Sequence, residues 1–119
     1  MREISRLADK GDETAKLAID MYCYRIKKYI GAYYAALGRV DALVFTGGVG
    51  ENAAAIRAQC CKDLTRLAIE IDAAKNGRPT RGIFEIQSET TPVKILVIPT
   101  NEELEIAEQT VARIKTVNR

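Results

Sequence analysis

The sequence predicts an α/β domain in which helices flank a mixed β-sheet. The evidence is a helical spacing of apolar residues over 12–37, an apolar run over 40–45 that leads into glycines, and a second apolar run over 93–98 followed by another helical pattern. With 119 residues and 47% hydrophobic composition, the chain is long enough to bury one core. We therefore expect residues 1–119 to form a single domain.

The first helices begin and end at residues with known capping preferences. Residues 1–11 form a short helical turn, and Asp12 caps the long helix that follows and ends at Gly38. Spacings of three and four predict a single buried face on this helix, composed of Ala18, Met21, Tyr22, Ile26, Tyr29, Ile30, Tyr33 and Leu37. All five tyrosines lie on this helix, and we expect their rings to pack against the sheet.

The rest of the chain alternates between strand and helix patterns. In chain order, these patterns predict a strand over 40–45, a helix over 52–64, a strand over 67–71, a turn over 76–79, strands over 83–86 and 93–98, and a helix over 101–116. The first strand shows little alternation, which is typical of a strand buried on both faces. Thr100 and Glu103 have the spacing of a capping box for the last helix.

Composition excludes several classes of partner and chemistry. The net charge is +2 and the charges are interspersed, so we expect no nucleic acid and no membrane as partners. The chain has no long apolar run or signal-peptide pattern, and its three cysteines form no CxxC motif, which together predict a reducing, cytoplasmic location. Without histidine, any chemistry requires carboxylates, Arg, Lys, a metal or groups of another chain.

The glycines at 47, 48 and 50 directly follow the predicted strand over 40–45. Glycines let a ligand approach bare backbone, and the helix after them offers free N–H groups, so we predict a ligand-facing loop that binds a nucleotide. The pattern G-x-x-x-x-G-K-[ST] is absent, which excludes a P-loop. A purine or ribose against the backbone, with Glu51 and Asn52 bonding sugar hydroxyls, suits these residues better. The alternative is a structural turn with no ligand.

A dinucleotide-binding fold is a second alternative for this segment. Residues 48–53 fit G-x-G-x-x-A after a strand, and Glu70 or Asp72 follows about twenty residues later. Two observations weigh against it. Glu51 would place a carboxylate where the pyrophosphate belongs, and a long helix precedes what should be the first strand of the domain.

Two carboxylates follow the predicted strand over 93–98. Glu102 and Glu103 lie at the carboxyl end of that strand, where open α/β sheets place ligand groups. Mg²⁺ in phosphoryl transfer is often held by one or two carboxylates, so Glu102 alone would suffice if phosphates supplied the other ligands. The alternative is that both glutamates only stabilise the start of the last helix.

Three segments, 24–33, 45–52 and 98–104, closely resemble acetate kinases, a family that includes propionate kinases. The resemblance implies the second domain of the acetate and sugar kinase, heat-shock cognate and actin superfamily, which has a ribonuclease H-like fold. It implies that this chain is the C-terminal, nucleotide-binding part of such an enzyme. It assigns ATP or ADP contacts to Arg2, Gly48, Val49, Gly50, Glu51 and Asn52, and magnesium to Glu102.

The same resemblance implies direct phosphoryl transfer between ATP and acetate, in a homodimer. No catalytic residue of the family falls in this chain, because its acetate pocket, catalytic arginines and histidine belong to sequence upstream. We therefore expect the isolated chain to have little or no kinase activity. The chain departs from the family pattern at Ala68, where a glycine is common, and it lacks the aspartate that would precede Met1. A non-catalytic module for dimerisation or nucleotide binding remains an alternative.

Overall fold

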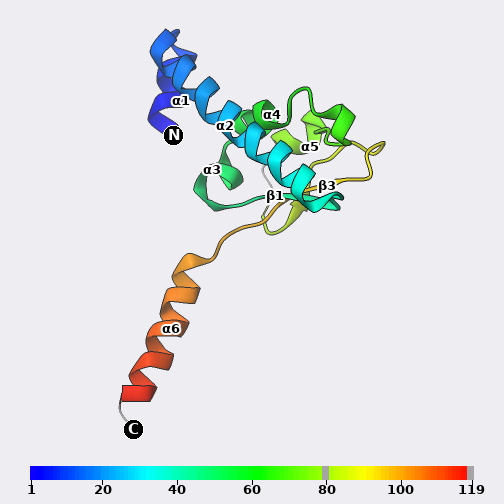
Figure 1. Ribbon diagram of the computed structural model, residues 1–119. Helices are drawn as coiled ribbons and strands as arrows, with labels where there is room; N and C mark the ends of the chain where they lie inside the picture. The colour runs from blue at the N-terminus through cyan, green and yellow to red at the C-terminus, as the bar shows by residue number, and fades with distance from the viewer. Residues whose placement is uncertain (79–80, 118–119) are drawn as a thin grey trace.

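The structure, a computed structural model, describes residues 1–78 and 81–117, without the side chains of Glu102 and Val117. Figure 1 shows its helices and strands, which in chain order are α1 (Arg2–Asp9), α2 (Glu13–Leu37), β1 (Ala42–Phe45), α3 (Gly47–Asn52), α4 (Ala54–Cys61), the 3₁₀ helix η1 (Thr65–Leu67), α5 (Ala73–Gly77), β2 (Phe84–Glu85), β3 (Lys94–Val97) and α6 (Glu102–Val117). Helices therefore accompany a small sheet, and the predicted α/β class is confirmed at this level.

The described strands form a mixed sheet in the order β1-β3-β2. β1 pairs parallel with β3, with Ala42 opposite Lys94, and β2 pairs antiparallel with β3. Ile95 and Val97 of the central strand are buried, whereas β1 lies at the edge and Val44 is 46% exposed. The prediction that the first strand is buried on both faces is wrong, because an edge strand of a small sheet has one neighbour.

The core has two parts. One lies around the sheet and contains Cys61, Ile69, Ile86, Val93, Ile95 and Val97. The other lies between α2 and α4 and contains Cys23, Ile56 and Cys60. All three cysteines are free, and burial raises the pKa of both Cys60 and Cys61 to about 12, so these thiols stay protonated near neutral pH. The cysteines therefore act as small apolar residues.

Helix α2 begins and ends as predicted, but of its predicted buried face only Ile26 and Ile30 turn toward the core. The Asp12 carboxylate accepts a hydrogen bond from Ala15 N at 2.9 Å, and Gly38 ends the helix at φ +71°. The face turned to the core carries Ala15, Ile19, Cys23, Ile26, Ile30 and Tyr34. Of the predicted face, Met21, Tyr22, Tyr29, Tyr33 and Leu37 are exposed. Because α2 is apolar on two faces, periodicity could not tell which one packs inward.

The predicted strand over 67–71 is wrong. η1 occupies its start, Ala68 adopts a left-handed conformation at φ +56°, and Ile69 N donates to Leu64 O at 3.3 Å. A positive φ interrupts an extended backbone, so what remains of the strand is an isolated bridge between Ile71 and Gln87. The apolar alternation here reflects the burial of single side chains, chiefly Ile69.

At helix ends, the predicted capping box is wrong, and the predicted turn over 76–79 is wrong at its start. Helix α6 is capped by Asn101, whose Oδ1 accepts from Leu104 N at 3.3 Å, instead of by the predicted Thr100 and Glu103 box. The start of the predicted turn over 76–79 belongs to α5, whose N-cap Asp72 accepts from Lys75 N at 2.9 Å; Pro79 lies outside the described residues. Asn101 thus caps the start of α6, and Asp72 caps the start of a helix that continues through Asn76 and Gly77.

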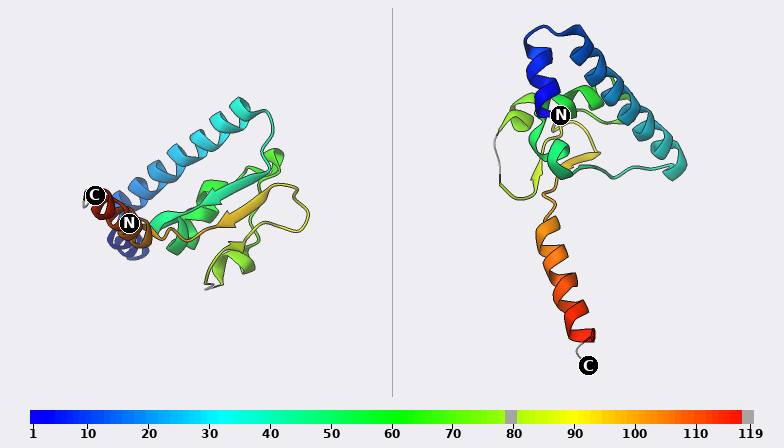
Figure 2. Two further views of the ribbon diagram at one scale, coloured as in Figure 1. Left: turned by 90° about the horizontal axis from the view of Figure 1, so that it is seen from below. Right: turned by 90° about the vertical axis from the view of Figure 1, so that its left-hand side faces the viewer.

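Helix α6 extends away from the rest of the molecule (Figures 1 and 2). The radius of gyration is 17.5 Å, compared with roughly 13–14 Å for a compact domain of this length. Apolar side chains on α6, including Leu104, Val111 and Ile114, are exposed. Among the described residues, no helix combines the length and apolar character that crossing a membrane would require.

Replacement of Ala68 by glycine tests the left-handed position. Glycine adopts positive φ without the steric cost of a Cβ, so Ala68→Gly should raise the free energy of unfolding by about 0.5–1 kcal/mol in urea titrations. The matched control is Ala58→Gly at an exposed position within α4, which should lower it by about 1 kcal/mol through lost helix propensity. A loss of stability in both variants would contradict the positive φ at Ala68.

Candidate functional site

The glycine-rich segment lies between β1 and α4 and forms the six-residue helix α3. The sequence predicts a loop here, and this prediction is wrong, because Gly47 to Asn52 form hydrogen-bonded helical turns. The Asn52 amide donates to Gly48 O at 2.9 Å, which ties the end of α3 to its start.

Gly50 lies against the backbone of β1. An added Cβ at this position would lie 3.1 Å from the carbonyl carbon of Phe45, whereas one added at Gly48 would meet no atom within 4 Å. Gly50 therefore allows α3 to approach the sheet more closely than a residue with a Cβ would. Gly48 leaves bare backbone facing open space.

A groove of about 750 Å³ lies between α1 and α3. Figures 1 and 2 show these two helices near each other, although they are distant in the sequence. Four of the predicted nucleotide residues line this groove, namely Arg2, Gly48, Val49 and Asn52. The fold thus brings α1 and the glycine segment to one cavity.

Glu51 lines a second, smaller hollow of about 360 Å³, which also includes Gly48, Asn101 and Glu103. Glu51 Oε1 accepts a hydrogen bond from Thr100 N at 2.8 Å. The Thr100 hydroxyl contacts the Thr46 hydroxyl and accepts from Gly47 N at 3.2 Å. These bonds join the end of β1, helix α3 and the segment that leads into α6.

Glu102, the predicted magnesium residue, begins α6, and its side chain lies outside the described part of the structure. Its neighbours Asn101 and Glu103 line the smaller hollow. Among the described residues, no group of three or more His, Cys, Asp or Glu side chains is placed to hold a metal ion.

Sequence reasoning missed Arg57, which is 3% exposed. Its Nη1 donates to Gly50 O at 2.7 Å and to Glu51 O at 3.0 Å, and its Nε donates to Asn76 Oδ1 at 2.8 Å. Burial lowers the pKa of this guanidinium. The available signal was its position within the apolar stripe of Ile56, Cys60 and Leu64, where a charged residue is unexpected.

Paired glycine substitutions test the packing of α3. Gly50→Ala should lower the free energy of unfolding by about 1–3 kcal/mol, because the backbone of Phe45 must shift to admit the methyl group. Gly48→Ala should leave it unchanged or raise it by about 0.5–1 kcal/mol, because an added methyl meets open space in a helix. Urea titration measures the free energy of unfolding of both variants. Equal changes in Gly50→Ala and Gly48→Ala would contradict the close approach at Gly50.

Comparison with known proteins supports the resemblance noted in the sequence. The model of the Acetokinase family matches residues 1–108. Acetate kinase from Syntrophobacter fumaroxidans is 57% identical over 115 residues, which are 97% of this chain and 28% of that protein. Acetate kinase from Oleidesulfovibrio alaskensis is 54% identical over 115 residues, which are 97% of this chain and 29% of that protein.

Solved structures show the same similarity. A crystal structure of Porphyromonas gingivalis acetate kinase matches with a TM-score of 0.82 and 45% identity, covering 93% of this chain and 28% of that one. A propionate kinase from Francisella tularensis matches with a TM-score of 0.77 and 46% identity, covering 89% of this chain and 27% of that one. The chain thus spans less than a third of the length of these relatives. Its sequence and its fold together show that the chain belongs to the Acetokinase family.

Proposed function

We propose that this chain is the C-terminal, nucleotide-binding part of a cytoplasmic acetate kinase that transfers phosphate between ATP and acetate. The observation that carries the proposal is the groove between α1 and α3, which is lined by Arg2, Gly48, Val49 and Asn52. Residues 1–119 would form one domain of the acetate and sugar kinase, heat-shock cognate and actin superfamily.

The chemistry of the groove suits a nucleoside diphosphate. Its volume of about 750 Å³ lies within the range of small-molecule sites, roughly 300–1,000 Å³. The bare backbone at Gly48 lets a flat base or ribose approach closely, and the Asn52 side chain offers an amide for hydroxyl groups. Arg2 supplies a positive charge for phosphate.

Residues at the smaller hollow have the oxygen donors that Mg²⁺ prefers. Glu51 and Glu103 carry carboxylates there, and Glu102 lies between Asn101 and Glu103 in the sequence. One or two such carboxylates are enough when phosphates complete the coordination, so this donor set fits a metal held together with the nucleotide. Bound magnesium would neutralise negative charge on the phosphates. Gly50 and Glu51 do not line the groove, so their part in nucleotide binding would be to hold α3 against Phe45 and Thr100.

The dinucleotide-binding alternative finds no support in this arrangement. In that fold, the glycines form the turn between a strand and a helix, and the pyrophosphate lies at the start of the helix. Here Gly48 and Gly50 lie inside the short helix α3, and Gly50 packs on Phe45.

Calorimetric titration of the chain with ADP, with and without Mg²⁺, tests the proposal. We expect ADP to bind, and Arg2→Ala to weaken binding by about tenfold or more, because it removes a charge-assisted contact. The matched control is Arg25→Ala, which removes the same charge from the outer face of α2 and should change affinity less than about twofold.

Three outcomes would contradict the nucleotide assignment. They are an absence of ADP binding by the wild-type chain, tighter binding of NAD than of ADP, and equal effects of Arg2→Ala and Arg25→Ala. Tighter NAD binding would favour the dinucleotide alternative.

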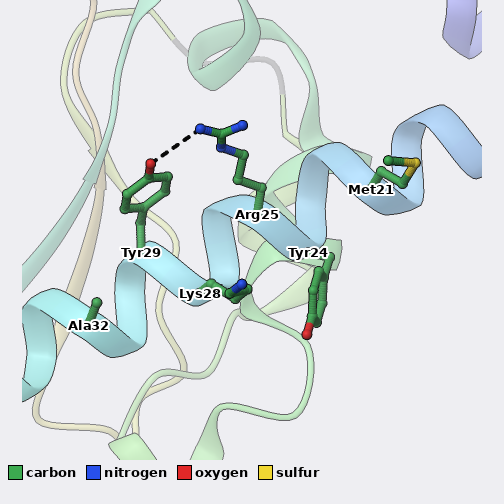
Figure 3. A pocket seen from close by; sticks show the side chains of 6 residues that line it. All are labelled: Met21, Tyr24, Arg25, Lys28, Tyr29 and Ala32. Atoms are coloured by element: carbon green, nitrogen blue, oxygen red, sulfur yellow. Dashed lines mark hydrogen bonds between the residues drawn. The ribbon is translucent and has the colours of Figure 1, made fainter.

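A second candidate function, self-association, is favoured by the outer face of α2. Met21, Tyr24, Arg25, Lys28, Tyr29 and Ala32 line one surface there, all from this single helix (Figure 3). Arg25 and Lys28 lie over the rings of Tyr29 and Tyr24, at 5.8 Å and 5.7 Å from the ring centroids.

Exposed apolar side chains suggest a second copy as the occupant of this face. Met21, Tyr24 and Tyr29 are 64%, 64% and 51% exposed. A pair of α2 helices about a two-fold axis would bury these side chains of one copy against those of the other.

Sedimentation equilibrium tests this interface. We expect a dimer that Met21→Glu dissociates, because it places a charge in an apolar contact. Ile83→Glu is the matched control, since Ile83 is 67% exposed compared with 64% for Met21 and lies outside α2. A monomeric wild-type chain, or a dimer that both variants leave intact, would contradict self-association through α2.

A further inference from the structure

We propose that Arg57 is a positioning residue that holds helix α3 in the place where nucleotide binding requires it. Arg57 is not among the residues that line the groove, so it would act on affinity through α3. The inference rests on the proposed function for the nucleotide, but the placement of α3 can be tested separately.

One side of the guanidinium holds the end of α3. Nη1 donates to the carbonyl oxygens of Gly50 and Glu51 at 2.7 Å and 3.0 Å. Carbonyls in the last turn of a helix lack partners within the helix, and a cation there also meets the negative end of the helix dipole. The contact thus fixes the residues that lie directly beside Val49 and Asn52 of the groove.

The other side of the guanidinium is held by α5. Nε donates to Asn76 Oδ1 at 2.8 Å, Nη2 donates to Asn76 O at 3.0 Å, and the Asn76 amide donates to Ala54 O at 2.9 Å. Asn76 is 6% exposed. Because Ala54 begins α4, this network holds α3, α4 and α5 in one arrangement.

Packing of α4 alone does not account for an arginine at this position. Burying a cation costs free energy that an apolar residue would avoid, and the oxygens that accept the hydrogen bonds of Arg57 are all neutral. What an arginine adds is a rigid set of donors that reaches two helices at once. Lysine keeps the charge but concentrates its donors on one nitrogen, so it would not hold both sides in this geometry.

The test compares the wild-type chain with Arg57→Lys and Asn76→Ala, at a temperature where circular dichroism shows each chain folded. We expect Arg57→Lys to weaken ADP binding by about tenfold or more and Asn76→Ala to weaken it less. Amide hydrogen exchange of α3 should become faster in both variants, while exchange in β3 stays at the wild-type rate. If Arg57→Lys does not fold, Asn76→Ala carries the test, because it keeps the arginine and removes its support.

The control for general destabilisation is Ile69→Val, in the core around the sheet, because Ile69 takes no part in the hydrogen bonds that hold Arg57. It should lower stability and leave both ADP affinity and α3 exchange at their wild-type values. Unchanged exchange in α3 of the Arg57 and Asn76 variants would overturn the inference, as would an equal loss of affinity in Ile69→Val. If the wild-type chain binds no ADP, the proposed function fails, and the exchange of α3 alone decides whether Arg57 positions this helix.

Discussion

The buried guanidinium of Arg57 joins three helices that the sheet alone would not hold together. β1 and β3 bring the ends of two strands side by side, and this places Thr46 next to Thr100. The sheet sets the direction in which the chain leaves β1, but it does not set the path of the next residues. That path depends on Arg57, which binds the end of α3 on one side and Asn76 on the other.

Helix α3 has little tendency to form from its own sequence. It has six residues, and three of them are glycines, each of which costs about 1 kcal/mol relative to alanine in a helix. Helices much shorter than about 12 residues are unstable in isolation. Its helical state therefore depends on tertiary contacts, namely the approach of Gly50 to Phe45, the donors of Arg57 and the bond from Thr100 N to Glu51.

Local signals made part of the fold predictable. Asp12 and Gly38 mark the ends of α2 because capping and positive φ depend on the residues at the helix end. The inward face of α2 was not predictable, because both Cys23 and Met21 lie on apolar faces and tertiary packing chooses between them. The same limit explains the wrong strand at 67–71, where the positive φ of Ala68 was invisible in an alternating apolar pattern. Gly48 and Asn52 were predicted from the glycine pattern after a strand, and Arg2 and Val49 from the family resemblance. Arg57 was missed because it lies outside the motif and contacts the groove only through α3.

The contacts that order α3 lie apart from its face toward the groove, and this separation affects how tightly a ligand can bind. A segment that orders only when a ligand arrives loses part of the binding energy to that ordering, whereas a segment already held in place does not. Here the face of α3 toward the groove carries Gly48 and Asn52, and the contacts that order the helix come from Phe45, Arg57 and Thr100 on its other sides. Bare glycine backbone can therefore face a ligand without the mobility that three glycines would otherwise bring. A glycine-rich helix of six residues needs support from residues outside it, and the buried Arg57 on the following helix supplies part of that support without lining the groove.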